Sequence, residues 1–175
     1  EEILCLEDVV VSDLVGNSLE QKSYCTTKEG LPVIYGCTAP EAMNHAPLAT
    51  IDDGSCLFNT LFQVDMTDTT DFSPSDGVYL QGEFNAWCDA CSPMESGEGG
   101  LIWTQNLALP SGSHEYRFAY GKGEPIIESI GVASPCDFNP EDMNALRGVD
   151  VDDAAVSLPL VCFGQCTPCS VALPE

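Results

Sequence analysis

Ten cysteines in 175 residues constrain this chain more than any other feature. Such a density is rare in a reducing cytosol and common outside the cell, where each disulfide stabilises a fold by about 2–4 kcal/mol. Cys88-x-x-Cys91 and Cys166-x-x-Cys169 have the spacing of zinc ligands, but the other six cysteines have no metal role and both histidines lie elsewhere. We therefore predict an extracellular or cell-surface protein with all ten cysteines in disulfides: Cys5, Cys25, Cys37, Cys56, Cys88, Cys91, Cys136, Cys162, Cys166 and Cys169.

The charge balance excludes one large class of partners. The chain has five Lys and Arg residues but 28 Asp and Glu residues, which gives a net charge of −23. Such a chain repels the phosphates of nucleic acids, so nucleic-acid binding is excluded. No apolar run approaches the roughly 18 residues that a membrane span needs, and we expect no membrane insertion. Because the chain opens at Glu1-Glu2 without Met, we expect mature or excised material whose targeting segment has been removed.

The N-terminal segment has the pattern of an apolar strand. Ile3 to Val15 is rich in branched aliphatic residues, and Ser23 to Tyr35 indicates a second strand or hairpin arm that places Cys25 to pair with Cys5. The segment has no obvious partner in the stretch that follows. It must therefore find a sheet edge in its own chain or in a neighbouring copy. We favour the neighbour, which predicts head-to-tail assembly into a homo-oligomer or a homopolymeric filament.

Alternation of apolar and polar residues predicts the main domain. Leu57 to Met66 has this pattern, and His114, Tyr116, Phe118 and Tyr120 alternate with polar or small residues. Gly77 to Phe84 and Leu101 to Leu109 are further predicted strands. Period two indicates β-strands, so we predict an all-β fold. The predicted divisions are an N-terminal strand segment at 1–35, a small Cys-bounded module at 36–56, a β-sandwich with a Cys-rich closing segment at 57–169 and a tail at 170–175.

Two stretches of this domain resemble a known family. Gly77 to Trp87 reads GVYLQGEFNAW, a strand that runs into a corner with an aromatic, and Leu107 to Tyr120 reads LALPSGSHEYRFAY. The pair resembles the glycogen- and starch-binding carbohydrate modules, which are immunoglobulin-like β-sandwiches of the early-set type. The resemblance implies that fold, and α-glucan as a polysaccharide partner.

Sugar binding needs an exposed aromatic platform flanked by polar side chains. The candidates are Trp87, Trp103, Asn85 and Lys122. In the relatives a second Trp follows the "YxF" strand, whereas this chain has Tyr120-Gly-Lys122 there. The alternative is that both tryptophans cover the core, and we expect this of Trp87 at least.

Gly36 to Cys56, GCTAPEAMNHAPLATIDDGSC, resembles a Cys-bounded repeat of secreted and surface proteins of marine bacteria such as the Bacteroidetes. The resemblance implies a Cys37–Cys56 disulfide. A segment with so few apolar residues needs such a covalent closure in order to fold. Val161 to Cys166 resembles the closing strands of the same surface modules. There we expect a Cys136–Cys162 bridge, and disfavour Cys166–Cys169 because so short a loop is strained.

Clustered aspartates suggest Ca²⁺ as a cofactor. Carboxylates beside a Gly turn suit a hard cation, although Ala39 and Ala46 replace acidic positions of the repeat. The alternative is an Asx turn that only shapes the loop at Asp52-Asp53-Gly54. The candidate ligands are Asp52, Asp53, Asp65, Asp68, Asp71 and Asp76.

Catalysis finds little support in the sequence. No spacing singles out a pair of carboxylates, and no serine has a G-x-S-x-G setting. We therefore predict no enzyme. The expected function is a structural or adhesive surface protein, and the alternative is a carbohydrate-binding module of a larger secreted protein.

Overall fold

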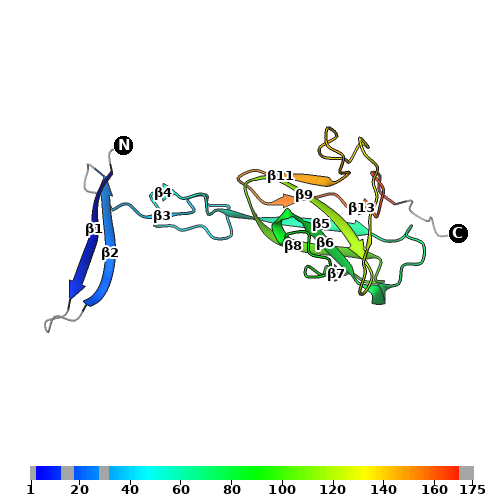
Figure 1. Ribbon diagram of the computed structural model, residues 1–175, viewed down its shortest axis with the longest axis horizontal. Helices are drawn as coiled ribbons and strands as arrows, with labels where there is room; N and C mark the ends of the chain where they lie inside the picture. The colour runs from blue at the N-terminus through cyan, green and yellow to red at the C-terminus, as the bar shows by residue number, and fades with distance from the viewer. Residues whose placement is uncertain (1–2, 13–17, 28–31, 170–175) are drawn as a thin grey trace. The chain divides into compact units, whose positions relative to one another are not determined.

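The computed structural model describes residues 3–12, 18–27 and 32–169, with side chains from residue 32 onward. The chain divides into two compact units, Glu1–Cys56 and Leu57–Glu175. Every described element is a β-strand, apart from the single-turn 3-10 helices η1 (Pro74–Asp76) and η2 (Glu83–Asn85). The predicted all-β class is therefore confirmed (Figure 1).

The first unit begins with a β-hairpin. β1 (Ile3–Ser12) pairs antiparallel with β2 (Ser18–Thr27), and Cys5 lies opposite Cys25 in the register. The expectation that the N-terminal strand lacks a partner in the following stretch was wrong, because β2 begins five residues before the predicted second strand and supplies that partner. The side chains of Cys5 and Cys25 lie outside the described residues, so their bridge stays a prediction.

Residues 32–56, the part of this unit described with side chains, form a loop closed by a disulfide. β3 (Tyr35–Gly36) and β4 (Ile51–Asp52) pair parallel over two residues. Cys37 and Cys56 are bonded with their Cα atoms 4.7 Å apart, as predicted, and both are buried. In the part of this unit described with side chains, Ala42 is the other buried apolar residue. So small a core explains why the segment needs a covalent closure.

The second unit contains two sheets that face each other (Figure 1). In one, β5 pairs antiparallel with β8, β7 adds to β8, and β12 and β13 lie parallel to β5. In the other, β9 pairs antiparallel with β6, β10 and β11. The strands are β5 (Leu57–Asp65), β6 (Val78–Gly82), β7 (Glu95–Ser96), β8 (Ile102–Pro110), β9 (Gly112–Tyr120), β10 (Ile126–Ile127), β11 (Arg147–Val151), β12 (Val156–Ser157) and β13 (Val161–Cys162).

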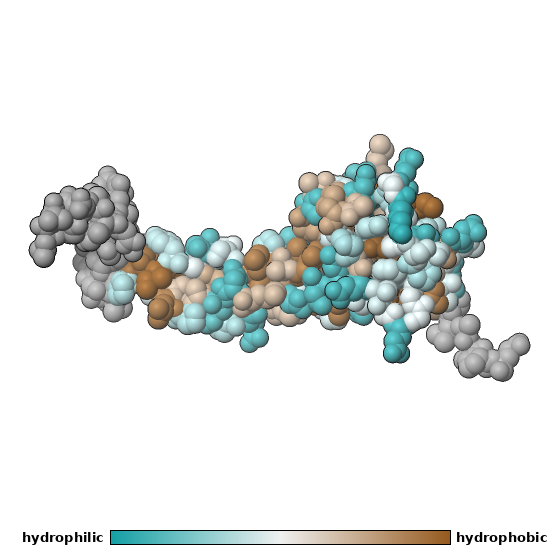
Figure 2. Space-filling model, turned by 90° about the horizontal axis from the view of Figure 1, so that it is seen from below, coloured by the Kyte–Doolittle hydropathy of each residue, from teal (hydrophilic) through white to brown (hydrophobic). Residues whose placement is uncertain are grey.

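The core lies between these sheets. Along β5, alternate residues are buried, which confirms the period-two prediction. Phe62 of β5 meets Tyr116 of β9 edge-on with ring centroids 4.9 Å apart, so the two sheets pack face to face. Burial raises the pKa of the Tyr116 hydroxyl well above its ordinary value, and Arg147 partly opposes the shift. On the face shown in Figure 2, hydrophilic and hydrophobic surface residues of this unit are interspersed.

One edge of β9 has a gap that a charged side chain fills. β11 pairs with residues 112–116 of β9, and β10 pairs with residues 119 and 120. Between them, the backbone N–H of Glu128 donates to the Phe118 carbonyl at 3.0 Å, and the Glu128 carboxylate accepts the Phe118 N–H at 2.8 Å. The carboxylate thus takes the place of a strand carbonyl at this edge.

Arg147 neutralises that buried carboxylate. Its guanidinium lies 2.9 Å from Glu128 Oε2, and the two side chains are only 4% and 2% exposed. The same guanidinium donates to the carbonyls of Cys162 and Gln165 at 3.3 and 2.8 Å, and Gly164 N–H donates to Glu128 Oε2. The ion pair therefore joins β9, β11 and the Cys-rich closing segment.

The closing disulfides correct the predicted Cys136–Cys162 bridge. Cys136 is bonded to Cys166, and Cys162 to Cys169. Cys162 sits buried on β13 at the end of β5, and a turn that ends at Gln165 reverses the chain. The turn brings Cys166, rather than Cys162, to Cys136. The short Cys166–Cys169 alternative is likewise not formed, whereas Cys88 and Cys91 are bonded to each other.

The Arg147–Glu128 pair can be tested by removing one charge. Arg147→Met should lower the free energy of unfolding by about 3–5 kcal/mol, because Glu128 stays buried without its counter-charge. Adding Glu128→Gln should restore part of the loss. Chemical denaturation followed by tryptophan fluorescence reports this unit, since both tryptophans lie in it.

Lys122→Met is the matched control, because Lys122 is exposed and should change stability by less than about 0.5 kcal/mol. A loss below about 1 kcal/mol for Arg147→Met would contradict the assigned role.

Candidate functional site

A groove of about 660 Å³ opens beside Trp87 in the second unit. One side comes from β9, which contributes Glu115 and Arg117. The rest comes from two loop segments, one that follows β10 and one that precedes β11. The lining residues are Trp87, Glu115, Arg117, Glu128, Ser129, Gly131, Val132, Met143, Asn144, Ala145 and Leu146.

The corner after β6 sets the position of Trp87. Asn85 Nδ2 donates to the Leu80 carbonyl at 2.8 Å, and its Oδ1 accepts the Gly82 N–H at 3.0 Å, so the amide closes the turn on both sides. Gly82 is needed there because a Cβ would lie 2.5 Å from the Phe84 ring. The backbone then passes through two left-handed residues, Ala86 at φ 53° and Trp87 at φ 56°.

Two non-glycine residues in the left-handed region are costly, by about 1–3 kcal/mol each, and such strain gathers at functional sites. Trp87 is held there by its N–H, which donates to the Gly82 carbonyl at 2.9 Å. The turn leaves the indole half-buried at the groove. Trp87 is therefore not among the fully buried core residues, and whether it is needed to cover the core stays a prediction.

Arg117 braces the indole. Its guanidinium carbon lies 5.3 Å from the centre of the Trp87 ring, within the range of a cation–π contact. Its Nε donates to Oε1 of Gln81 at 2.8 Å, and Gln81 is fully buried. A buried amide thus anchors the one cationic side chain among the lining residues.

Glu115 is the groove's unneutralised carboxylate. Partial burial is the largest cause of the raised pKa of Glu115, and the nearby carboxylates of Asp142, Glu83 and Asp137 raise that pKa further. Within the portion of the chain described with side chains, its carboxylate has no hydrogen bond and no ion pair. Glu128, by contrast, is neutralised by Arg147. Glu115 therefore marks a place where a ligand could donate hydrogen bonds.

Asp142 shapes the loop opposite β9. Its Oδ1 accepts the Asn144 N–H at 2.7 Å, and its Oδ2 accepts from the Asn139 amide at 3.1 Å. The turn brings Asn144 to the groove lining and leaves Met143 91% exposed. A side-chain amide and a flexible thioether are therefore presented at the rim.

The other predicted sugar-binding residues lie elsewhere. Trp103 is 7% exposed, donates from Nε1 to the Gly100 carbonyl at 3.0 Å and contacts the Phe72 ring, so it belongs to the core. Asn85 serves the corner, and Lys122 is exposed in the loop after β9. Of the four candidates, only Trp87 lines the groove.

Sequence reasoning missed Glu115 and Arg117, although β9 contains a signal. Tyr116, Phe118 and Tyr120 are buried, so the residues that alternate with them must face away from the core. Glu115 and Arg117 therefore share the outer face of the strand, and both lie beside the corner that the "FNAW" motif forms.

The aspartates at Asp52-Asp53-Gly54 form turns with the loop's own backbone. Asp52 Oδ1 accepts the Gly54 N–H at 2.7 Å, and its Oδ2 accepts the Thr38 N–H and hydroxyl at 3.2 and 2.9 Å. Asp53 Oδ1 accepts the Ser55 N–H at 3.0 Å. These are Asx turns, the alternative to a Ca²⁺ site. The Gly54 N–H, followed by the Thr38 donors, lowers the pKa of Asp52.

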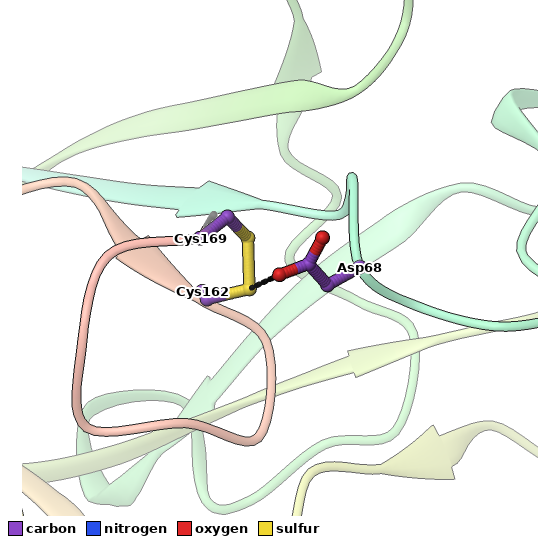
Figure 3. Close-up of side chains that lie close together, drawn as sticks. All are labelled: Asp68, Cys162 and Cys169. Carbon is purple, nitrogen blue, oxygen red and sulfur yellow. Dashed lines mark hydrogen bonds between the residues drawn. A yellow bond between two sulfur atoms is a disulfide. The ribbon is translucent and has the colours of Figure 1, made fainter. Parts of the chain in front are cut away.

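The second aspartate loop is used in a similar way. Asp65 accepts from the N–H and hydroxyl of Thr67, and Asp76 accepts the Ser73 N–H at 3.0 Å. Asp68 and Asp71 are exposed. Asp68 points toward the disulfide between Cys162 and Cys169 (Figure 3). Its carboxylate oxygen lies within 4.8 Å of both sulfurs. Because those sulfurs are bonded to each other, neither can act as a thiolate ligand.

Comparisons with known proteins leave the family open. No family model matches the chain. A segment of 29 residues, 17% of the chain, is 62% identical to part of the chloroplastic ribulose bisphosphate carboxylase/oxygenase activase of Spinacia oleracea. The match spans only 6% of that protein, so it assigns neither fold nor activity to this chain. Among the described residues, no helix has the length and apolar character of a membrane span.

The Asp52 turns predict a pH dependence in the Cys37–Cys56 loop. Because the folded pKa of Asp52 lies below the ordinary 3.8, its stabilisation is complete above that value and is lost as the pH falls through the folded pKa. An NMR titration of the side-chain carboxyl should show the lowered pKa.

Hydrogen exchange provides the matched comparison. Asp52→Ala should reduce protection of the Thr38 and Gly54 amides, whereas Asp53→Ala should affect Ser55 alone. Equal protection in wild type and Asp52→Ala would contradict the turn assignment.

Proposed function

We propose that this chain is a non-catalytic extracellular surface module with a structural or adhesive role, and that it adheres by binding carbohydrate in the Trp87 groove. Four disulfides among the described cysteines suit an oxidising compartment. The motif from Gly36 to Cys56 adds support for a secreted surface protein like those of marine bacteria.

The half-buried indole of Trp87 in a groove is the observation that carries the proposal. Binding sites for small ligands have volumes of about 300–1,000 Å³ and combine aromatic surface with a few polar groups. This groove has that size, and it offers Trp87 for stacking on a sugar ring with Glu115 and Asn144 for its hydroxyls. The left-handed backbone at the corner suits a residue that is held for contact.

The charges in the groove disfavour catalysis. Glycoside hydrolysis uses two carboxylates at a defined separation. Glu115 and Glu128 are the carboxylates of the lining, and Glu128 is committed to Arg147 and to the N–H groups of the backbone. A single available carboxylate supports binding rather than bond cleavage.

The two tryptophans provide a matched test. Trp87→Ala should abolish binding of soluble α-glucan, measured by calorimetric titration because the substitution removes the indole whose fluorescence would report binding, and it should destabilise the fold less than a core substitution does. Trp103→Ala removes a core side chain and should cost about 3–5 kcal/mol. The proposal fails if Trp87→Ala binds the glucan as wild type does, or if wild type binds no polysaccharide.

A second role, assembly, has its own observation. Among the described residues, β1 and β2 form a sheet of two strands with no third. An isolated hairpin is marginally stable, and each strand has an outer edge of unpaired N–H and C=O groups. A strand from another copy would satisfy these groups and could propagate head-to-tail. The unit of assembly would thus be the hairpin rather than a single strand.

Deletion of residues 1–27 tests this role. The shortened chain should sediment as a monomer at concentrations where the intact chain forms larger species, because its strand edges have been removed. Its tryptophan fluorescence should be unchanged, since both tryptophans lie in the second unit. A monomeric intact chain at high concentration would contradict the assembly proposal.

A further inference from the structure

We infer that the Trp87 groove selects carbohydrate that has protonated amino groups, such as glucosamine units, and that Glu115 is the residue that confers this specificity. The inference rests on the proposed function, because it names the class of sugar for the same groove. It follows from how the charges around the indole are distributed between satisfied and unsatisfied groups.

The two guanidinium groups near the groove, those of Arg147 and Arg117, already contact other groups of the protein. Arg147 is buried against Glu128 and two backbone carbonyls. Arg117 lies over the Trp87 ring and donates to the buried amide of Gln81. Neither guanidinium lies in an ion pair with Glu115. The carboxylate of Glu115 thus has no ion-pair partner in the part of the chain that the structure describes with side chains.

Other acidic groups surround Glu115. Asp142 of the opposite loop, Glu83 of η2 and Asp137 are all close enough to act on it electrostatically. Four carboxylates, counting Glu115, therefore stand here against the one guanidinium of the groove lining, in a protein whose net charge is −23. A ligand that brings a positive charge would relieve the repulsion among these carboxylates, whereas an anionic ligand would increase it.

The geometry makes an amino sugar the fitting cation. Glu115 and Trp87 line the same groove, so a ligand can contact both at once. A sugar ring that stacks on the indole would bring a ring substituent near the carboxylate. An ammonium at that position makes a charge-assisted hydrogen bond, which is about twice as strong as the bond that a neutral hydroxyl makes. Neutral sugar still fits, but without this gain.

Matched oligosaccharides test the inference directly. Calorimetric titrations of the full chain would compare β-1,4-linked hexamers of glucosamine, N-acetylglucosamine, glucose and glucuronate, with an α-glucan hexamer as reference. The pH is set so that both the amine and Glu115 are charged. We expect the glucosamine hexamer to bind about 10-fold or more tightly than the glucose hexamer, and the glucuronate hexamer to bind most weakly.

Glu115→Gln keeps the size of the side chain and removes its charge. It should bring the ratio of glucosamine to glucose affinity close to one. Glu124→Gln removes the same charge from an exposed residue outside the groove lining and should leave the ratio as in wild type. An equal fall in both variants would mean general attraction to an acidic protein, and would overturn the inference.

The remaining outcomes separate the two proposals. If neutral hexamers bind through Trp87 as tightly as glucosamine, carbohydrate binding stands and the amine preference is wrong. If no oligosaccharide binds, both proposals fail. If a lysine-rich peptide binds equally well and Trp87→Ala does not weaken it, the groove is not the cation's site, and the amino-sugar inference is overturned.

Discussion

The buried ion pair between Arg147 and Glu128 is the contact on which the second unit depends. It fills the gap along β9 between two short edge strands and holds the closing segment against them. Glu128 also begins one loop of the groove, and Arg147 directly follows the other. The two loops that face Trp87 are therefore tied to each other at their bases. A buried pair is costly unless its hydrogen bonds are satisfied, and here backbone groups satisfy them.

The strand β9 connects this core to the proposed site. Its aromatic residues pack between the sheets, and the residues that alternate with them face outward. Arg117 supports the indole from that outer face, and Glu115 adds an unneutralised carboxylate. The rigid core thus fixes the spacing of groups that a ligand would meet. A site built on a strand and on tied loops requires little rearrangement on binding.

Local patterns predicted much of the fold. Alternation along Leu57–Met66 and from His114 to Tyr120 located the central strands, and the resemblance of Gly36–Cys56 to a Cys-bounded repeat implied its disulfide. Long-range pairing could not be predicted in this way. The Cys136–Cys166 bridge depends on where a turn after β13 places the chain, and nothing local to either cysteine reports that.

The site was harder to predict than the fold, for a similar reason. The orientation of Trp87 depends on two left-handed residues, which a sequence without glycine at either position does not indicate. Glu128 and Arg147 lie 19 residues apart, in segments without a clear alternation of apolar and polar residues, so their ion pair could not be predicted from the sequence. The outward face of β9 was visible from its alternation, and it would have identified Arg117 and Glu115.

The most direct test of the account is an NMR titration of the uniformly ¹⁵N-labelled chain with an oligosaccharide. The chain has two tryptophans and hence two indole N–H signals, one at the groove and one in the core. We predict that the Trp87 indole signal and the amides of Glu115, Arg117 and Asn144 shift on binding, while the Trp103 indole stays in place. Shifts confined to other surfaces, or no shift with any oligosaccharide, would contradict the account.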